Sequence, residues 1–148
     1  MAEDVSHVIA AIAGSKKLAV VGVSDKKFGG YAYHELKKRG YEVIPVHPVR
    51  ESFDGDKCVA TLKEVPPDVT AALVAVGPEA VRRVVADAAT SSVTHLWFQQ
   101  GTDCSEAVAE AQALGIKSVS NKCIMMYAEP VRGIHAFHRF LAKLFGRY

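Results

Sequence analysis

Residues 18–48 contain the pattern that most limits how this chain can fold. An apolar run ends at Gly22, a polar loop and an amphipathic segment follow, and a second apolar run ends before Pro48. This order is typical of a strand, a phosphate-type loop, a helix and a parallel strand, within the length of one βαβ unit. Because Gly22 has no Cβ atom, a ligand can approach the backbone there, and the amides of the next helix favour an anion. We therefore expect a nucleotide-phosphate site in this loop.

The alternation of apolar runs and amphipathic segments continues along the chain. Apolar runs at 18–21, 42–46, 71–76, 95–98 and 116–119 are expected to be strands, with helices at 30–39, 78–88 and 105–114 and a short helix before residue 14. Strands that are apolar throughout indicate a parallel sheet covered on both faces. We therefore predict an α/β, Rossmann-like three-layer sandwich, with a parallel five-stranded sheet and helices on both faces.

The domain organisation is expected to be simple. The chain of 148 residues fits a single domain over 1–148, with a core at about 15–130 and an extra C-terminal helix at about 134–145. Residues 49–68 are less regular, and we expect only a short extended piece at 58–60 and a helical turn at 62–65. The terminal helix is expected to pack on its own domain, with a homodimer contact as the alternative.

Composition excludes several classes of function. Net charge is +2 and the basic residues are spread along the chain, which argues against a nucleic-acid partner. No apolar run approaches the roughly 20 residues that cross a bilayer, so no membrane role is expected. Three separated cysteines (Cys58, Cys104 and Cys123) favour neither a disulfide framework nor a metal site, and they suggest a cytoplasmic protein.

Ligands of open parallel sheets bind beyond the carboxyl ends of the strands. In this chain those ends are rich in glycine and polar residues. No catalytic set accompanies them, and no metal site is predicted. The candidate cofactor-binding residues are Gly22, Val23, Ser24, Lys26, Tyr31, His47, Pro48, Arg50, Gly77, Pro78, Asn121 and Cys123.

The loop does not match the usual dinucleotide fingerprint. Ser24 stands where a second glycine is expected, no third glycine falls in phase, and His47 replaces the acidic residue that binds a free ribose. Lys26 and Arg50 are close enough in sequence to meet a phosphate instead. A phosphorylated ribose therefore fits better than a bare one, which leaves NADP and coenzyme A. No Walker-type G-K-S or G-K-T occurs, so an ATPase is not expected.

Over about residues 15–130 the chain resembles the stand-alone CoA-binding domain proteins, relatives of the N-terminal domain of the succinyl-CoA synthetase α subunit. The resemblance rests on the segments 21–24, 40–41, 46–48, 96–99 and 121–123. It implies that the pyrophosphate of CoA meets the Gly22–Ser24 loop. The adenosine would then lie near 47–48 and 77–78, and the pantetheine arm would reach towards Asn121 and Cys123. The chain departs from the family at His47, where Asn is common, and at Gly77, where a basic or polar residue is common.

Three functions are consistent with these residues. The first is a non-catalytic protein that binds coenzyme A or an acyl-CoA; the others are an NADP-dependent oxidoreductase and a detached CoA-binding subunit of an acyl-CoA synthetase with a partner chain. Cys123 is interpreted as packed rather than reactive, and His135 and His138 as packing residues rather than metal ligands. If the loop is the site, Gly22→Val is expected to abolish binding and to leave the protein folded.

Overall fold

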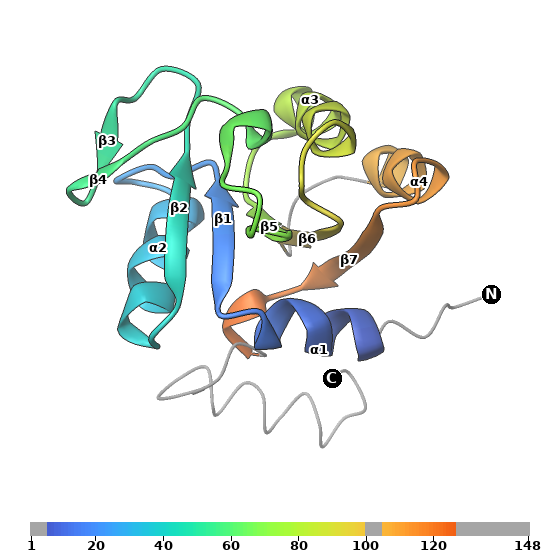
Figure 1. Cartoon of the computed structure of the whole chain (residues 1–148), viewed down its shortest axis with the longest axis horizontal. Coiled ribbons are helices and arrows are strands. Elements are labelled where there is room, and N and C mark those ends of the chain that lie inside the picture. The colour runs from blue at the N-terminus through green and yellow to red at the C-terminus, as the bar shows by residue number, and fades with distance from the viewer. Residues whose placement is uncertain (1–5, 100–104, 127–148) are drawn as a thin grey trace.

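A parallel five-stranded sheet forms the centre of the protein (Figure 1). The computed structural model describes residues 6–99 and 105–126. The strands are β1 (Lys17–Val21), β2 (Glu42–Val46), β5 (Ala71–Val74), β6 (His95–Gln99) and β7 (Lys117–Lys122). Their order is β2-β1-β5-β6-β7 and every pair in it is parallel. The predicted sheet is confirmed. After β1 the chain adds β2 on one side and β5, β6 and β7 on the other, so the topological switch point lies between β1 and β5.

Helices cover both faces of the sheet (Figure 1). The helices α1 (Ser6–Gly14) and α2 (Phe28–Lys38) pack on one face, and α3 (Pro78–Ala89) and α4 (Ser105–Ala113) on the other. Successive residues of a strand point to opposite faces. Leu18 and Val20 of β1 accordingly belong to the core under α1 and α2, whereas Ala19 and Val21 belong to the core under α3 and α4. The predicted Rossmann-like architecture is therefore confirmed.

A small antiparallel hairpin follows β2 and was not expected from the sequence. It pairs β3 (Ser52–Phe53) with β4 (Asp56–Lys57). Asp54 and Gly55 have φ values of 53° and 80°, as the two central residues of a type I′ turn require. The Asp-Gly dipeptide was the available signal, but strands of two residues are too short to show a period. The expected helical turn is present as η1 (Leu62–Glu64).

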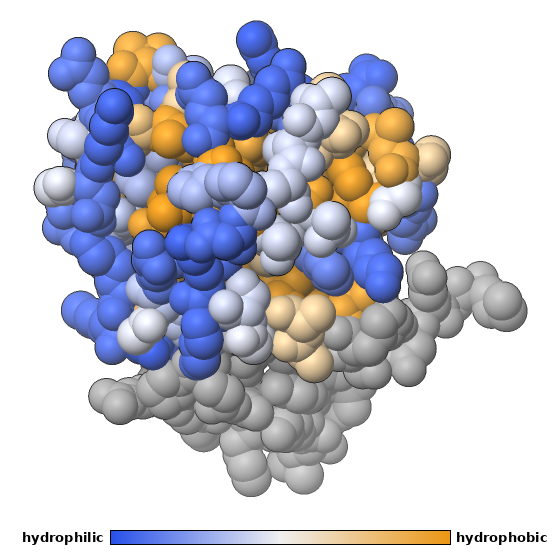
Figure 2. Space-filling model, viewed as in Figure 1, coloured by the Kyte–Doolittle hydropathy of each residue, from blue (hydrophilic) through white to orange (hydrophobic). Residues whose placement is uncertain are grey.

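Charged and aromatic side chains of α2 hold the hairpin. Lys37 Nζ lies 2.7 Å from a carboxylate oxygen of Asp56 and 3.1 Å from one of Asp54. The Tyr33 hydroxyl donates a hydrogen bond to Asp56, and the Tyr33 ring meets Phe53 edge-on at 5.1 Å. Figure 2 shows hydrophilic side chains gathered on the left of this face, over α2. The segment between β2 and β5 is therefore anchored to α2.

The last strand extends further than the sequence predicted. β7 continues to Lys122, whose carbonyl accepts a hydrogen bond of 2.9 Å from the Trp97 indole N–H. The pairing with β6 shifts register between Trp97 and Gln99, and Asn121 adopts a φ of 61°. The expected strand end at Val119 is therefore wrong, because the bulge lets pairing resume beyond it. The short η2 (Ile124–Met126) follows.

One expected element lies in another part of the chain. The helix expected at 134–145 falls outside the described residues, so the single domain over 1–148 stays a prediction. None of the helices within 6–99 and 105–126 has the length and apolar character needed to cross a membrane.

Candidate functional site

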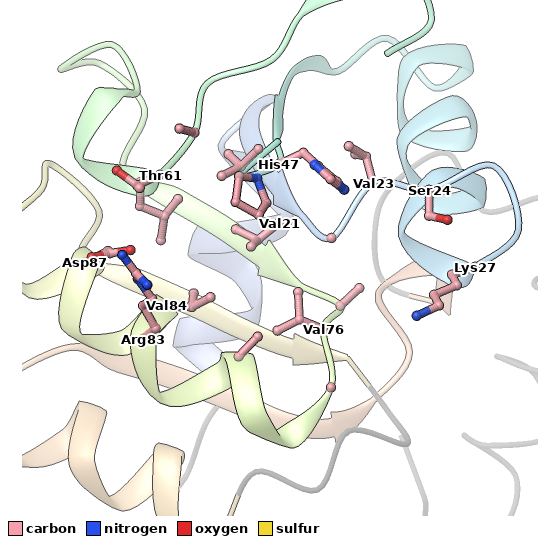
Figure 3. Close-up of a pocket in the computed structure, with 18 residues that line it drawn as sticks. Val21, Val23, Ser24, Lys27, His47, Thr61, Val76, Arg83, Val84 and Asp87 are labelled. Carbon is pink, nitrogen blue, oxygen red and sulfur yellow. The ribbon is translucent and has the colours of Figure 1, made fainter. Parts of the chain in front are cut away.

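A pocket of about 550 Å³ lies at the switch point of the sheet (Figure 3). It opens between the carboxyl ends of β1, β2 and β5 and the adjoining face of α3. Its walls are formed by residues 21–24 and 27, 46–48, 60–62, 75–77, and 80, 83, 84 and 87. The crevice that open α/β sheets use for ligands is therefore present where the topology places it.

The two ends of the pocket differ in chemistry. Figure 3 shows Ser24 and Lys27 at one end and Thr61, Arg83 and Asp87 at the other. Lys27 is the N-cap residue of α2, so the Ser24 end combines a hydroxyl, an ammonium group and the positive end of a helix. These groups favour an anion. Apolar side chains, including Val21 and Val76, line the space between the two ends.

Gly22 shapes the floor of the pocket. Its φ is 98°, and a Cβ atom at this position would lie 2.2 Å from the carbonyl oxygen of Ala75. Its amide donates to the carbonyl of Val46 at 3.3 Å, so this amide is committed to the neighbouring strand. A side chain at Gly22 would strain the backbone and separate β1 from β5. These contacts argue against the expectation that Gly22→Val leaves the protein folded, and we now expect this substitution to destabilise the fold as well as the site.

Two further glycines bring α2 close to the loop. A Cβ atom on Gly29 would lie 2.1 Å from the carbonyl oxygen of Gly22, and one on Gly30 would lie 1.8 Å from that of Ser24. The third glycine of a dinucleotide fingerprint serves the same close packing of helix and strand. Here Gly29 serves this packing from a position further from Gly22 than the fingerprint has it. No glycine therefore stands at the fingerprint spacing.

His47 lines the pocket and also closes a turn. Its Nδ1 atom accepts the backbone N–H of Val49 at 3.1 Å and that of Arg50 at 2.9 Å. A nitrogen that accepts two such bonds carries no proton, so the proton of the neutral ring resides on Nε2. The capping role and the pocket position are therefore combined in one side chain.

The structure separates the predicted cations from the pocket. The guanidinium of Arg50 lies over the Phe53 ring at 4.9 Å and contacts a carboxylate oxygen of Asp25 at 3.1 Å. Neither Arg50 nor Lys26 lines the pocket. The lining cations are Lys27, one residue beyond Lys26, and Arg83 on α3.

Half of the predicted site residues are brought together. Gly22, Val23, Ser24, His47, Pro48 and Gly77 line the pocket, whereas Lys26, Tyr31, Arg50, Pro78, Asn121 and Cys123 do not. Pro78 is the first residue of α3, directly after Gly77.

Tyr31 belongs to α2, and Cys123 lies on the α1 and α2 side of the sheet. Burial raises the pKa of Tyr31, with Glu35 as the next cause and a smaller contribution from the neighbouring Cys123. Cys123 packs against the core under α1 and α2. Asn121 belongs to β7, which β6 separates from β5 by two strand spacings, or about 10 Å.

Sequence reasoning missed the residues that line the α3 side. Ala80, Arg83, Val84 and Asp87 recur at helical spacing, so they share one face of α3. That spacing, in the helix that follows a switch-point strand, was a usable signal. Lys27 could not be separated from Lys26 by sequence, because only the conformation of the loop decides which one faces the pocket.

Metal-binding groups do not accompany the pocket. Within residues 6–99 and 105–126 there is no cluster of three or more His, Cys, Asp or Glu side chains that could hold a metal ion. Cys58 and Cys123 are free thiols. His135 and His138 lie outside the described residues.

Comparison with known proteins places the chain among relatives of the same fold. Residues 16–129 match the model of a family described as the CoA binding domain. The uncharacterized protein YneT of Bacillus subtilis (strain 168) is 30% identical over 112 residues, which cover 74% of this chain and 83% of that protein. A hypothetical protein from Pyrococcus horikoshii OT3 superposes with a TM-score of 0.76 at 28% identity, over 86% of this chain and 91% of that one.

A larger enzyme contains a domain of the same fold. The dinucleotide-forming acetyl-coenzyme A synthetase 1 of Ca. Korarchaeum cryptofilum, in its apo form, superposes with a TM-score of 0.67 at 24% identity. The superposition covers 76% of this chain and 28% of that chain.

Proposed function

The chain belongs to the CoA-binding domain family, and we propose that it binds coenzyme A or an acyl-CoA in the pocket at the ends of β1, β2 and β5. One observation supports this most directly: a single pocket joins an anion-favouring end at Ser24 and Lys27 to an apolar crevice beside α3. Coenzyme A presents the same sequence of groups, because its pyrophosphate is linked through a ribose to a flat base.

The pyrophosphate is assigned to the Ser24 end. Gly29 and Gly30 let α2 start close to the loop, so the positive end of the helix lies beside this end of the pocket. The Ser24 hydroxyl and the Lys27 ammonium add a donor and a positive charge. In this proposal Lys27 takes the place in phosphate binding that the sequence suggested for Lys26 or Arg50.

The adenosine is assigned to the crevice between His47 and α3. Its walls are Val46, Ala60, Leu62, Val76, Ala80 and Val84, which are apolar side chains suited to a flat ring. The pantetheine arm leaves at the Ser24 end, next to the start of α2. Its contacts with Asn121 and Cys123 stay a prediction, and so does a role for Tyr31 in binding.

We assign the protein the role of a binding protein that holds its ligand without chemistry of its own. His47 is the one imidazole among the described residues that line the pocket, and its Nδ1 is committed to a turn. A detached subunit of an acyl-CoA synthetase would use the same pocket with a partner chain. That alternative and the cytoplasmic location stay predictions.

Calorimetric titration tests the proposal. The protein is freed of carried-over ligand by refolding and titrated with CoA, dephospho-CoA, NADP and NAD. Tight binding of CoA, with NADP and NAD much weaker, is expected. If a cation contacts the 3′-phosphate, dephospho-CoA binds roughly ten- to a hundredfold more weakly than CoA. A preference for NADP would instead support the oxidoreductase. If none of the four ligands binds, the proposal is contradicted.

A further inference from the structure

Asp87 is the one carboxylate among the 18 described residues that line the pocket. The other charged residues of the lining are Lys27 and Arg83, which are basic. Asp87 lies near the end of α3, and its side chain is only 14% exposed. A carboxylate offers acceptors and no donor. The α3 end of the pocket therefore presents a negative, acceptor-only group in a lining that otherwise suits anions.

The described surroundings leave this carboxylate with capacity for a further donor. Its ionic partner is Lys63, whose Nζ lies 3.7 Å from Oδ1, beyond hydrogen-bond distance, and whose side chain is 55% exposed. Thr61, at the same end, uses its Oγ1 atom to accept the backbone N–H of Lys63 at 3.2 Å. A largely buried carboxylate is costly unless donors reach it. Besides Arg83, one turn earlier on α3, a ligand that fills the pocket can supply such a donor.

The face of α3 that lines the pocket leads to this carboxylate. Ala80 and Val84 are one turn apart and form an apolar strip, and Asp87 follows Val84 by three residues on the same side of the helix. A flat ring that packs along this strip meets the carboxylate with its edge. Arg83, on the same face of α3, and Lys63 place positive charge near this carboxylate. The pyrophosphate is therefore assigned to the other end by the Lys27 ammonium and the start of α2, and not by repulsion from Asp87.

We propose that Asp87 recognises the exocyclic amine of the adenine base and so selects an amino-bearing purine. The inference rests on the proposed function, because it takes the ligand to be coenzyme A with its pyrophosphate at Ser24. The ring nitrogens of adenine that face a neighbouring group are acceptors, whereas the amine is a donor. On the base, the amine is therefore the group that satisfies a carboxylate. The ribose 2′-hydroxyl is the competing donor, and the test separates it from the amine.

A thermodynamic cycle tests the proposal. Wild-type protein and Asp87→Ala are titrated with CoA and with an analogue of CoA in which hydrogen replaces the exocyclic amine. Hydrogen bonds to charged groups make a loss of roughly ten- to a hundredfold in wild-type affinity the expected result for the analogue. Asp87→Ala should bind CoA more weakly and should bind the two ligands equally. Glu110→Gln, on α4 and outside the pocket lining, is the control and should discriminate like the wild type.

Each other outcome counts against the inference. If the wild type binds CoA and the analogue equally, or if Asp87→Ala still prefers CoA to the analogue, Asp87 does not bind the amine. The proposal that the protein binds CoA is unaffected by either result. If Asp87→Ala loses affinity for both ligands by the same factor and keeps the discrimination, a ribose hydroxyl is the partner. If the wild type binds neither ligand, the inference and the proposed function fail together. Circular dichroism establishes that each variant is folded.

Discussion

Gly29 packs directly on the peptide of Gly22: a Cβ atom on Gly29 would lie 2.1 Å from the carbonyl oxygen of Gly22. The start of α2 therefore approaches the end of β1 as closely as two backbones allow. This contact places Ser24 and Lys27 at the mouth of the pocket and the amides of α2 behind them. The geometry of the anion-favouring end thus depends on a glycine that does not itself line the pocket.

Replacing this glycine is expected to damage the fold as well as the site. Gly29→Ala forces α2 away from β1, and overpacking of this kind costs about 1–3 kcal/mol of unfolding free energy. Urea denaturation measures the loss. Gly14→Ala is the matched control, because a Cβ atom there meets no other atom within 4 Å. The control should be as stable as the wild type or more so; equal stability of both variants would show that α2 can shift freely.

The pocket itself is tested by filling it. Ala80 and Ala86 are both exposed residues of α3, but Ala80 lines the pocket and Ala86 does not. Ala80→Trp should therefore block binding of CoA, while Ala86→Trp should leave the affinity unchanged. Calorimetry gives the affinities and thermal denaturation the stabilities, which should remain similar because neither side chain is in the core. Unchanged binding by Ala80→Trp would move the ligand site elsewhere.

Two adjacent lysines give a matched pair for the anion-favouring end. Lys27 lines the pocket and Lys26 does not, so Lys27→Gln should weaken binding of CoA about two- to fivefold, as expected for an exposed charge. Lys26→Gln should bind like the wild type. The salt dependence of the affinity, measured by calorimetry at two or three ionic strengths, should become shallower in Lys27→Gln alone. The reverse pattern would support the assignment made from sequence.

The contacts of Asp56 with Lys37 and Tyr33, which hold the β3–β4 hairpin on α2, predict a pH dependence of stability. The Lys37 ammonium, followed by the Tyr33 hydroxyl, holds the pKa of Asp56 below its ordinary value. A carboxyl whose pKa is lowered by folding stabilises the protein above its unfolded pKa of about 3.9, and this contribution disappears as the pH falls through the folded value. Asp56→Asn should thus be less stable than the wild type at pH 7.

The difference between the two proteins should shrink as the pH falls below about 4, because the wild type then loses the same interaction. Urea denaturation at several pH values measures it. Glu51→Gln, at an exposed position beside the hairpin, serves as the control and should follow the wild type throughout. A constant difference between wild type and Asp56→Asn at all pH values would show that packing rather than charge explains the loss.

The sequence predicts the sheet well because every strand except β7 is mainly apolar and the helices show a clear period. It fails where long-range geometry decides. The spacing around Gly22 suggested a missing glycine, yet Gly29 fills that role from a longer loop. The bulge opposite Gln99 carries β7 on to Lys122, and no local signal marks it. The site is predicted at the strand ends, whereas the wall from α3 depends on how a helix docks over them.

His47 offers the last prediction, since its role combines a turn and a pocket. Its Nδ1 atom accepts the N–H groups of Val49 and Arg50, two and three residues ahead. The side-chain oxygen of Asn accepts N–H groups at the same spacing, and Asn is the residue that is common here in the resembling family. His47→Asn should therefore retain the turn, whereas His47→Ala should lose about 1 kcal/mol of stability and part of the affinity for CoA.

Urea denaturation and calorimetry on the same two variants separate the roles of the ring. If the turn alone matters, His47→Asn matches the wild type in both stability and affinity. If His47→Asn keeps the stability but loses the affinity, the Nε2–H group of the ring donates to the ligand, because this donor is what the Asn side chain does not supply at the same place. If His47→Asn is as unstable as His47→Ala, Asn does not replace His47 in capping this turn, and the proposed equivalence of the two side chains is wrong.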